Sequence, residues 1–269
     1  MRPINQRLLP EDADVRTLEA SNAAILEVEA EERDAFMRAH ETECSALRTA
    51  LWRLGSHKCW YSEAKLPESA GHVEHYRPRK RLWGAVHGGY WWRAFDWRNL
   101  RLAHQIVNLR KTDHLTGKRA GKGSYFPLRE EETRANNREE EANETPVLLD
   151  PIVPSDTRLI CFSEDGVPRP RYTEEQNEWA YRRAEASIDY YHLNEGTWNV
   201  RRAELMTAVR KLCEQLDVFA VEQPRDEAAY QDKIDEIWAY VDPLAEFSTA
   251  CWQVVADKNL LHHLLPGMP

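Results

Sequence analysis

The sequence predicts an α+β protein that is mostly helical, with a small irregular module held between two helical parts. In residues 12–54, and again in the last third of the chain, apolar residues recur at three- and four-residue steps, which is the spacing of amphipathic helices. Residues 57–128 instead combine short apolar runs with Gly and Pro, which is typical of strands and loops. We therefore expect an N-terminal helical arm at 1–56, a central module at 57–170 and a C-terminal helical domain at 171–269 that docks a partner.

Local patterns place the ends of several elements. The N-terminal arm reads as two helices, and Gly55 is a good stop for the second. The Asp165-Gly166 pair predicts the turn of a short β-hairpin. Four helices are expected after residue 173, with Thr197 as the N-cap of the second.

The composition argues against a membrane protein and favours the cytoplasm. The chain has 269 residues, of which 42% are hydrophobic, and its mean hydropathy is −0.70. No apolar run approaches the roughly 20 residues that a membrane-spanning helix needs. The five cysteines include no CxxC pair, so we expect reduced thiols.

The charge of the chain is unevenly distributed. The formal net charge is −9, yet residues 72–125 hold twelve Lys or Arg and only three Asp or Glu. This basic island has a balance of +9, so the remainder carries −18. A basic island in an acidic body suits local contact with phosphate groups.

A strongly acidic segment follows the basic island. Residues 129–146 contain seven Glu and almost no apolar residue, so we expect an acidic, solvated loop at 129–145 that need not be ordered. A sharper alternative is an electrostatic gate that repels nucleic acid until a partner moves the loop.

The stretch GHVEHYRPRK at 71–80 brings together the groups that phosphodiester hydrolysis needs. His75 is the natural general base, and Glu74 is a hard oxygen ligand suited to Mg²⁺. Adjacent residues of a strand point to opposite faces, so both can serve one site only if the chain turns or bulges there. Pro78 restricts Arg77 and makes such a turn plausible.

Two asparagines downstream complete the candidate site. Asn99 and Asn108 are nine residues apart, and we expect Asn99 in a loop and Asn108 on a helix. An amide oxygen is a neutral hard ligand for a metal ion, and a second amide can hold a neighbouring loop in place.

These segments together resemble the HNH endonucleases, the ββα-metal nucleases, and within them the PtuB-like effectors of Septu and retron anti-phage systems. The resemblance covers most of residues 50–205. It rests on five ordered elements: Glu74-His75 with Pro78, Tyr90-Trp91 through Trp97-Arg98-Asn99-Leu100, Asn108 to Lys111, Phe126-Pro127-Leu128, and LLDPIV at 148–153.

The resemblance implies a central ββα-metal module and a role for each site residue. His75 would be the general base, Asn99 would support the catalytic loop, and Glu74 and Asn108 would bind one Mg²⁺ or Mn²⁺ ion. The expected contacts to nucleic-acid phosphates are Arg77, Arg79, Lys80 and Lys111.

The main difference from the HNH family pattern is at the positions of its zinc knuckle. Its two Cys pairs are reduced here to Cys59, because Ser62, His104 and Val107 stand at the other three positions. Too few ligands remain for a tetrahedral structural site, so we expect no structural zinc and apolar packing by Val107 instead. A replacement site using His57 or His72 is the alternative.

The implied function is a metal-dependent HNH endonuclease acting as an anti-phage effector. The implied partners are a PtuA-like ABC-type ATPase and, in retron versions, a reverse transcriptase with its RNA–DNA product, msDNA. Two alternatives stay open: a toxin that cleaves RNA, including tRNA, with the same site, and a non-catalytic nucleic-acid-binding scaffold with a decayed site. The tryptophans at 91, 92 and 97 are expected to pack in the core rather than stack on bases.

Overall fold

The computed structural model describes residues 1–9, 13–112, 117, 119–221 and 226–265. The protein is α+β and mostly helical, which confirms the predicted fold class. The α-helices are α1 (Ala13–Leu26), α2 (Arg33–Ala39), α3 (Glu41–Ala46), α4 (Arg48–Leu54), α5 (Gln105–Asn108), α6 (Glu178–Tyr190), α7 (Gly196–Val221), α8 (Glu227–Val241), α9 (Ser248–Asp257) and α10 (Leu261–Leu264).

The strands form three separate two-stranded antiparallel ladders in the described part of the chain. The pairs are β1 (Gly71–His75) with β2 (Leu100–His104), β3 (Lys111–Thr112) with β4 (Arg119–Ala120), and β5 (Ile160–Phe162) with β6 (Pro168–Pro170). The turn between β5 and β6 contains Gly166 with φ at +75°, as the Asp165-Gly166 pair predicts.

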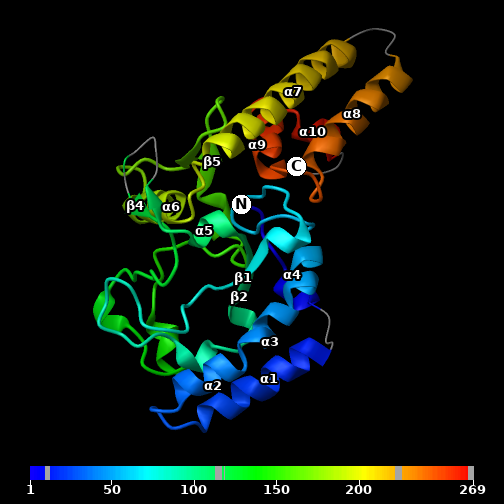
Figure 1. The fold of residues 1–269 in the computed structure, drawn as a ribbon. Helices are drawn as coiled ribbons and strands as arrows, with labels where there is room; N and C mark the ends of the chain where they lie inside the picture. Colours follow the sequence, from blue (N-terminus) through cyan, green and yellow to red (C-terminus); the bar gives the residue numbers. More distant parts are fainter. Residues whose placement is uncertain (10–12, 113–116, 118, 222–225, 266–269) are drawn as a thin grey trace.

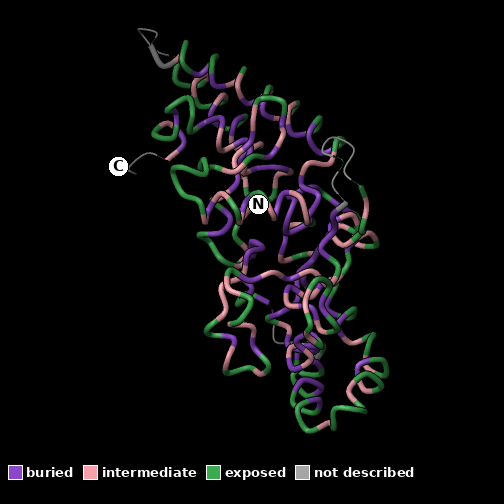
Figure 2. Tube along the Cα trace, turned by 90° about the vertical axis from the view of Figure 1, so that its left-hand side faces the viewer, coloured by how far each residue is buried: buried purple, intermediate pink, exposed green. Residues whose placement is uncertain are grey.

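The central β1–β2 hairpin lies between two groups of helices (Figure 1). Helices α1 to α4 lie against one side, and α6 to α10 lie on the other, where α7 and α8 form a long antiparallel pair. Buried backbone runs through the middle of the molecule, while exposed backbone gathers at its two ends (Figure 2). In the described chain, no helix is both long and apolar enough to cross a bilayer.

The N-terminal arm differs from the predicted pair of helices. The second predicted helix is divided into α2, α3 and α4, with breaks at His40 and Leu47. These breaks let short helices bend around the hairpin, so that Met37, Cys44 and Leu51 are buried in one apolar core with Leu100 and Leu102 of β2. Helix α4 ends at Leu54 next to Gly55, as predicted.

The C-terminal half follows the predicted pattern with two changes. Helix α7 begins at Gly196 and so includes Thr197, which we expected to precede it as the N-cap. The last predicted helix is two helices, α9 and α10. Side chains from α6 to α10 form one apolar core with Tyr61, Ala103 and Val107 of the central module. The five cysteines of the chain are free thiols in this structure.

Candidate active site

His75 is the last residue of β1, and its imidazole is held by two neighbouring segments. The Nε2–H group donates a hydrogen bond to the carbonyl oxygen of Ala94 at 2.8 Å. The thiol of Cys44, on α3, lies 3.9 Å from the same nitrogen and donates to the same carbonyl. The Nδ1 atom forms no hydrogen bond within the described part of the chain. This arrangement selects the neutral tautomer in which Nδ1 is free to accept a proton.

The surroundings of His75 keep the ring neutral. Burial lowers the pKa of His75 to about 3, the positive charges of Arg79 and Lys122 act in the same direction, and the Ala94 carbonyl opposes them. Arg79 binds the exposed carboxylate of Glu41 through Nη2 at 3.2 Å. Its other terminal nitrogen, Nη1, is buried and has no hydrogen-bond partner in the described chain. A neutral imidazole therefore lies beside a guanidinium with an unused donor.

Asn99 fixes the backbone that follows His75. Its Oδ1 accepts from the backbone N–H of Arg77 at 2.8 Å, and its Nδ2 donates to the carbonyl of Arg77 at 2.9 Å. The backbone N–H of Tyr76 also donates to the carbonyl of Asn99 at 2.9 Å. Asn99 thus clamps the chain between His75 and Pro78, where the sequence places a loop-supporting amide.

Glu74 lies on the other face of the hairpin. The register pairs Glu74 with Arg101 and His75 with Leu100, and no bulge interrupts it. Successive side chains therefore point to opposite faces, and the turn needed to bring Glu74 and His75 into one site is absent. The Glu74 carboxylate is 4% exposed, accepts from the Tyr61 hydroxyl at 2.7 Å and forms an ion pair with Lys122.

Lys122 supplies the cation on that buried face. Its ammonium pairs with Glu74 and donates to the carbonyl of His75 at 2.6 Å. Burial lowers the pKa of Lys122, and the Glu74 carboxylate opposes that shift. The neighbouring Arg101 is held by Asp150 through two hydrogen bonds of 2.8 and 2.7 Å. Each buried charge on this face therefore has a partner of opposite sign.

The expected ligand set does not fit a divalent ion in this arrangement. Glu74 is already neutralised by Lys122, and His75 points to the opposite face. Asn108 lies at the end of α5, and its buried Oδ1 has no hydrogen-bond partner among the described residues. The described residues contain no cluster of three or more His, Cys, Asp or Glu side chains with metal-ligand geometry.

Two of the positions where a zinc knuckle was considered hold side chains packed in the core. Cys59 and Val107 are both buried in the apolar core beneath the hairpin. Of the two alternative ligands, His57 stacks on Trp52 with ring centroids 3.8 Å apart, and His72 is exposed on β1.

Three of the four expected phosphate contacts are paired with carboxylates, since Arg79 binds Glu41 as described above. The Arg77 guanidinium donates to Glu144 at 3.0 and 2.9 Å, and Lys111 forms an ion pair with Glu195. Lys80 is exposed, and Arg79 lies near enough to His75 for its charge to lower the pKa of the imidazole. The structure thus brings together His75, Arg79 and the loop clamped by Asn99, and it leaves Glu74 and Lys111 elsewhere.

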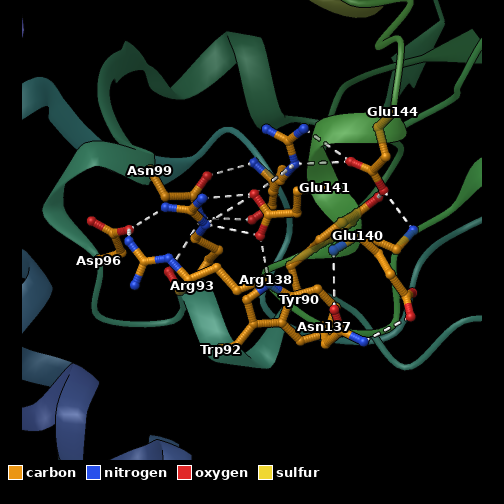
Figure 3. A network of polar contacts seen from close by, with 12 residues as sticks. Tyr90, Trp92, Arg93, Asp96, Asn99, Asn137, Arg138, Glu140, Glu141 and Glu144 are labelled. Atoms are coloured by element: carbon orange, nitrogen blue, oxygen red, sulfur yellow. Dashed lines mark hydrogen bonds and ion pairs between the residues drawn. The ribbon is translucent and has the colours of Figure 1, made fainter.

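The acidic segment is ordered and partly buried, contrary to the solvated loop that the sequence predicts. Glu141 accepts hydrogen bonds from Arg93 and from the indole N–H of Trp92, and Glu144 accepts from Tyr90 as well as Arg77 (Figure 3). The physical reason is pairing: these two carboxylates neutralise arginines of the basic island and are shielded from water by the aromatic rings around them. Glu131, Glu132 and Glu139 of the segment are exposed, as expected.

Sequence reasoning missed the role of Lys122. The one available pattern was its position between Gly121 and Gly123, which have φ values of +139° and +42°. A Cβ atom at Gly121 would lie 2.5 Å from the carbonyl oxygen of Leu109, so glycine is needed for this segment to approach α5 closely. That approach carries the ammonium to the buried face of the hairpin.

Comparison with known proteins gives one informative likeness. No protein-family model matches the chain. A Septu protein PtuB from Bacillus mycoides (strain KBAB4) is 29% identical over 128 residues, which are 45% of this chain and 40% of that protein. The chain therefore matches less than half of the length of this curated relative.

Proposed function

We propose that this protein hydrolyses nucleic-acid phosphodiester bonds and that His75 is the general base. The observation that carries the proposal is a neutral imidazole that is fixed through Nε2 by the Ala94 carbonyl, has an unbonded Nδ1, and lies near enough to the Arg79 guanidinium for that charge to lower its pKa. A fixed general base and a nearby cation are two of the groups that attack of water on a phosphodiester requires. The likeness to a Septu protein supports the same class of function.

In the proposed reaction, Nδ1 of His75 removes a proton from a water molecule as its oxygen bonds to phosphorus. The bond from phosphorus to the leaving oxygen breaks, and that oxygen takes a proton from solvent. The positive charge of the Arg79 guanidinium stabilises the negative charge that develops on the phosphate, and Asn99 holds the Arg77 backbone so that this geometry persists. An approaching phosphate anion raises the pKa of His75 from its low resting value, which makes the ring a more effective base.

We place this activity in an anti-phage defence system of the Septu or retron type. The partner would be a PtuA-like ABC-type ATPase, with a reverse transcriptase and msDNA in a retron version, all in the cytoplasm. The proposal rests on the match to the Septu relative and on the ordered motifs of residues 74–128. Co-purification of the chain with a co-expressed PtuA-like ATPase would test the partner.

The decisive experiment is a cleavage assay on labelled single-stranded DNA, duplex DNA, RNA and tRNA, with EDTA, Mg²⁺ or Mn²⁺. We expect wild-type cleavage of at least one substrate and a loss of about 10²- to 10⁴-fold in His75→Ala, with a melting temperature near wild type. His262→Ala removes an exposed histidine from α10 and serves as the matched control. Unchanged cleavage by folded His75→Ala would refute the base assignment.

The same assay separates the alternatives. Cleavage confined to RNA or tRNA would assign the chain as an RNA-cleaving toxin. Binding without cleavage under every condition would assign it as a non-catalytic scaffold. The pairing of Glu74 with Lys122 is the observation that supports this alternative, because it occupies an expected metal ligand. The Mg²⁺ or Mn²⁺ ion expected at Glu74 and Asn108 would first have to displace the Lys122 ammonium, and the reaction proposed here does not use an ion at that place.

A further inference from the structure

Trp83 differs from the other tryptophans around the central hairpin. The indole N–H groups of Trp52, Trp60, Trp92 and Trp97 donate hydrogen bonds inside the protein, and Trp91, which makes no such bond in the described chain, is only partly exposed. Trp83 is 40% exposed, and its indole N–H has no partner in the described part of the chain. An exposed indole with an unused donor contributes little to the core, so its position calls for another explanation.

Trp83 begins a row of aromatic rings drawn from three segments. Its ring centroid lies 5.2 Å from that of Tyr125, which in turn stacks on Tyr190 of α6 with centroids 4.0 Å apart and planes 24° apart. The Arg110 guanidinium lies 4.1 Å from the centroid of the Trp83 ring. The row therefore has an exposed aromatic end with a cation against it.

The surface beside Trp83 is open and cationic. A shallow hollow of about 550 Å³ is lined by Trp83, Arg81, Leu82, Val86 and Ser124 among others. Arg81 and Arg110 are exposed, as is the adjacent Lys80. Open aromatic rings interleaved with arginines bind unpaired bases by stacking while the cations hold the phosphates.

The aromatic row is attached to the backbone that supports the candidate active site. The backbone N–H of Trp83 donates to the carbonyl of Ser124 at 3.1 Å, which holds the Trp83 loop on the 122–126 segment. Three residues before Tyr125, Lys122 reaches the carbonyl of His75. A strand of nucleic acid bound along the row is thus anchored by the same segment that fixes the end of β1.

We propose that Trp83, Tyr125 and Tyr190, together with Arg81 and Arg110, form a binding surface for single-stranded nucleic acid. The inference rests on the proposed nuclease function and sharpens it, because stacking on an exposed indole requires a base that is not paired. Duplex DNA offers only its backbone to this surface and gains contacts with the cations alone.

The test measures binding by fluorescence anisotropy with labelled single-stranded DNA, single-stranded RNA and duplex of one sequence. The full-length His75→Ala protein is used so that no cleavage interferes. We expect a single strand to bind more tightly than the duplex. Adding Trp83→Ala should weaken single-strand binding by roughly 5- to 150-fold, whereas Trp83→Phe keeps the ring and most of the affinity.

Two outcomes would overturn the inference. One is equal affinity of the Trp83→Ala and Trp83→Phe proteins for every oligonucleotide. The other is equal weakening by Trp179→Ala, since Trp179 also has arginines over its ring but lies at the opposite end of α6 from Tyr190. The two experiments can be judged independently. If Trp83 proves not to bind nucleic acid, the comparison of cleavage by wild type and His75→Ala still tests the proposed function. If wild type does not cleave, the comparison of binding by the Trp83→Ala and Trp83→Phe proteins still tests this surface.

Discussion

The two faces of the β1–β2 hairpin contrast sharply. On one face, Glu74 pairs with Lys122, and Arg101 beside it pairs with Asp150, so that buried charges neutralise one another. On the other face, His75 is uncharged, its Nδ1 is unbonded, and the nearby Arg79 keeps a donor free. The first face is internally complete, and the second has unused hydrogen-bonding groups.

The contrast shows that adjacent residues of one strand can have different roles, one in stability and one in the candidate active site. Glu74 and His75 are adjacent in the sequence, yet the two-residue period of the strand places them in separate environments. A closed charge network holds the hairpin rigid, and that rigidity fixes the imidazole on the opposite side. We infer that the Glu74 face supports the site and that the His75 face contains it.

The largest effect on stability is expected from breaking the buried ion pair. Lys122→Met leaves the Glu74 carboxylate buried beside Tyr61 without its cation, which should lower the free energy of unfolding by about 3–5 kcal/mol. Urea denaturation followed by circular dichroism measures this change.

A double variant provides the matched control for the ion pair. Combining Glu74→Gln with Lys122→Met removes both charges. The double variant should therefore lose less free energy of unfolding than the sum of the losses in the two single variants. Simple additivity of the two single effects would show that the carboxylate and the ammonium do not interact, and would contradict the closed network on this face.

A smaller effect is expected from the clamp on the His75 face. Asn99→Ala leaves the backbone N–H and carbonyl of Arg77 without their partner, at a cost of about 1–3 kcal/mol. Because the clamp positions the loop after His75, cleavage should fall more steeply than stability. Asn99→Asp keeps the acceptor for the Arg77 N–H and should show an intermediate loss in both measurements. If Asn99→Ala equals wild type in both stability and cleavage, Asn99 does not position the loop after His75.

Much of the framework could be predicted from the sequence. Helical periodicity indicates the helical parts, and the Asp165-Gly166 pair predicts the β5–β6 turn. The resemblance to the HNH nucleases implies that Asn99 supports a loop, and its side chain hydrogen-bonds the backbone of Arg77 in the structure. These features depend on local patterns or on a short, ordered motif.

The remaining features depend on partners far apart in the chain. Lys122 reaches Glu74 across 48 positions, and a lysine between two glycines gives no indication of that destination. The acidic segment reads as solvated because its composition is polar, yet Glu141 and Glu144 are buried by arginines and aromatic rings more than 40 residues away. Composition alone cannot indicate which charges will be paired.

The most direct measurement compares single-turnover cleavage by the Glu74→Gln, Lys122→Met double variant with cleavage by His75→Ala, at a temperature where both are folded. If the two faces divide as described, the double variant retains cleavage within about tenfold of wild type, and His75→Ala loses about 10²- to 10⁴-fold. Loss of cleavage in the double variant with full activity in His75→Ala would contradict the account and place the chemistry on the Glu74 face.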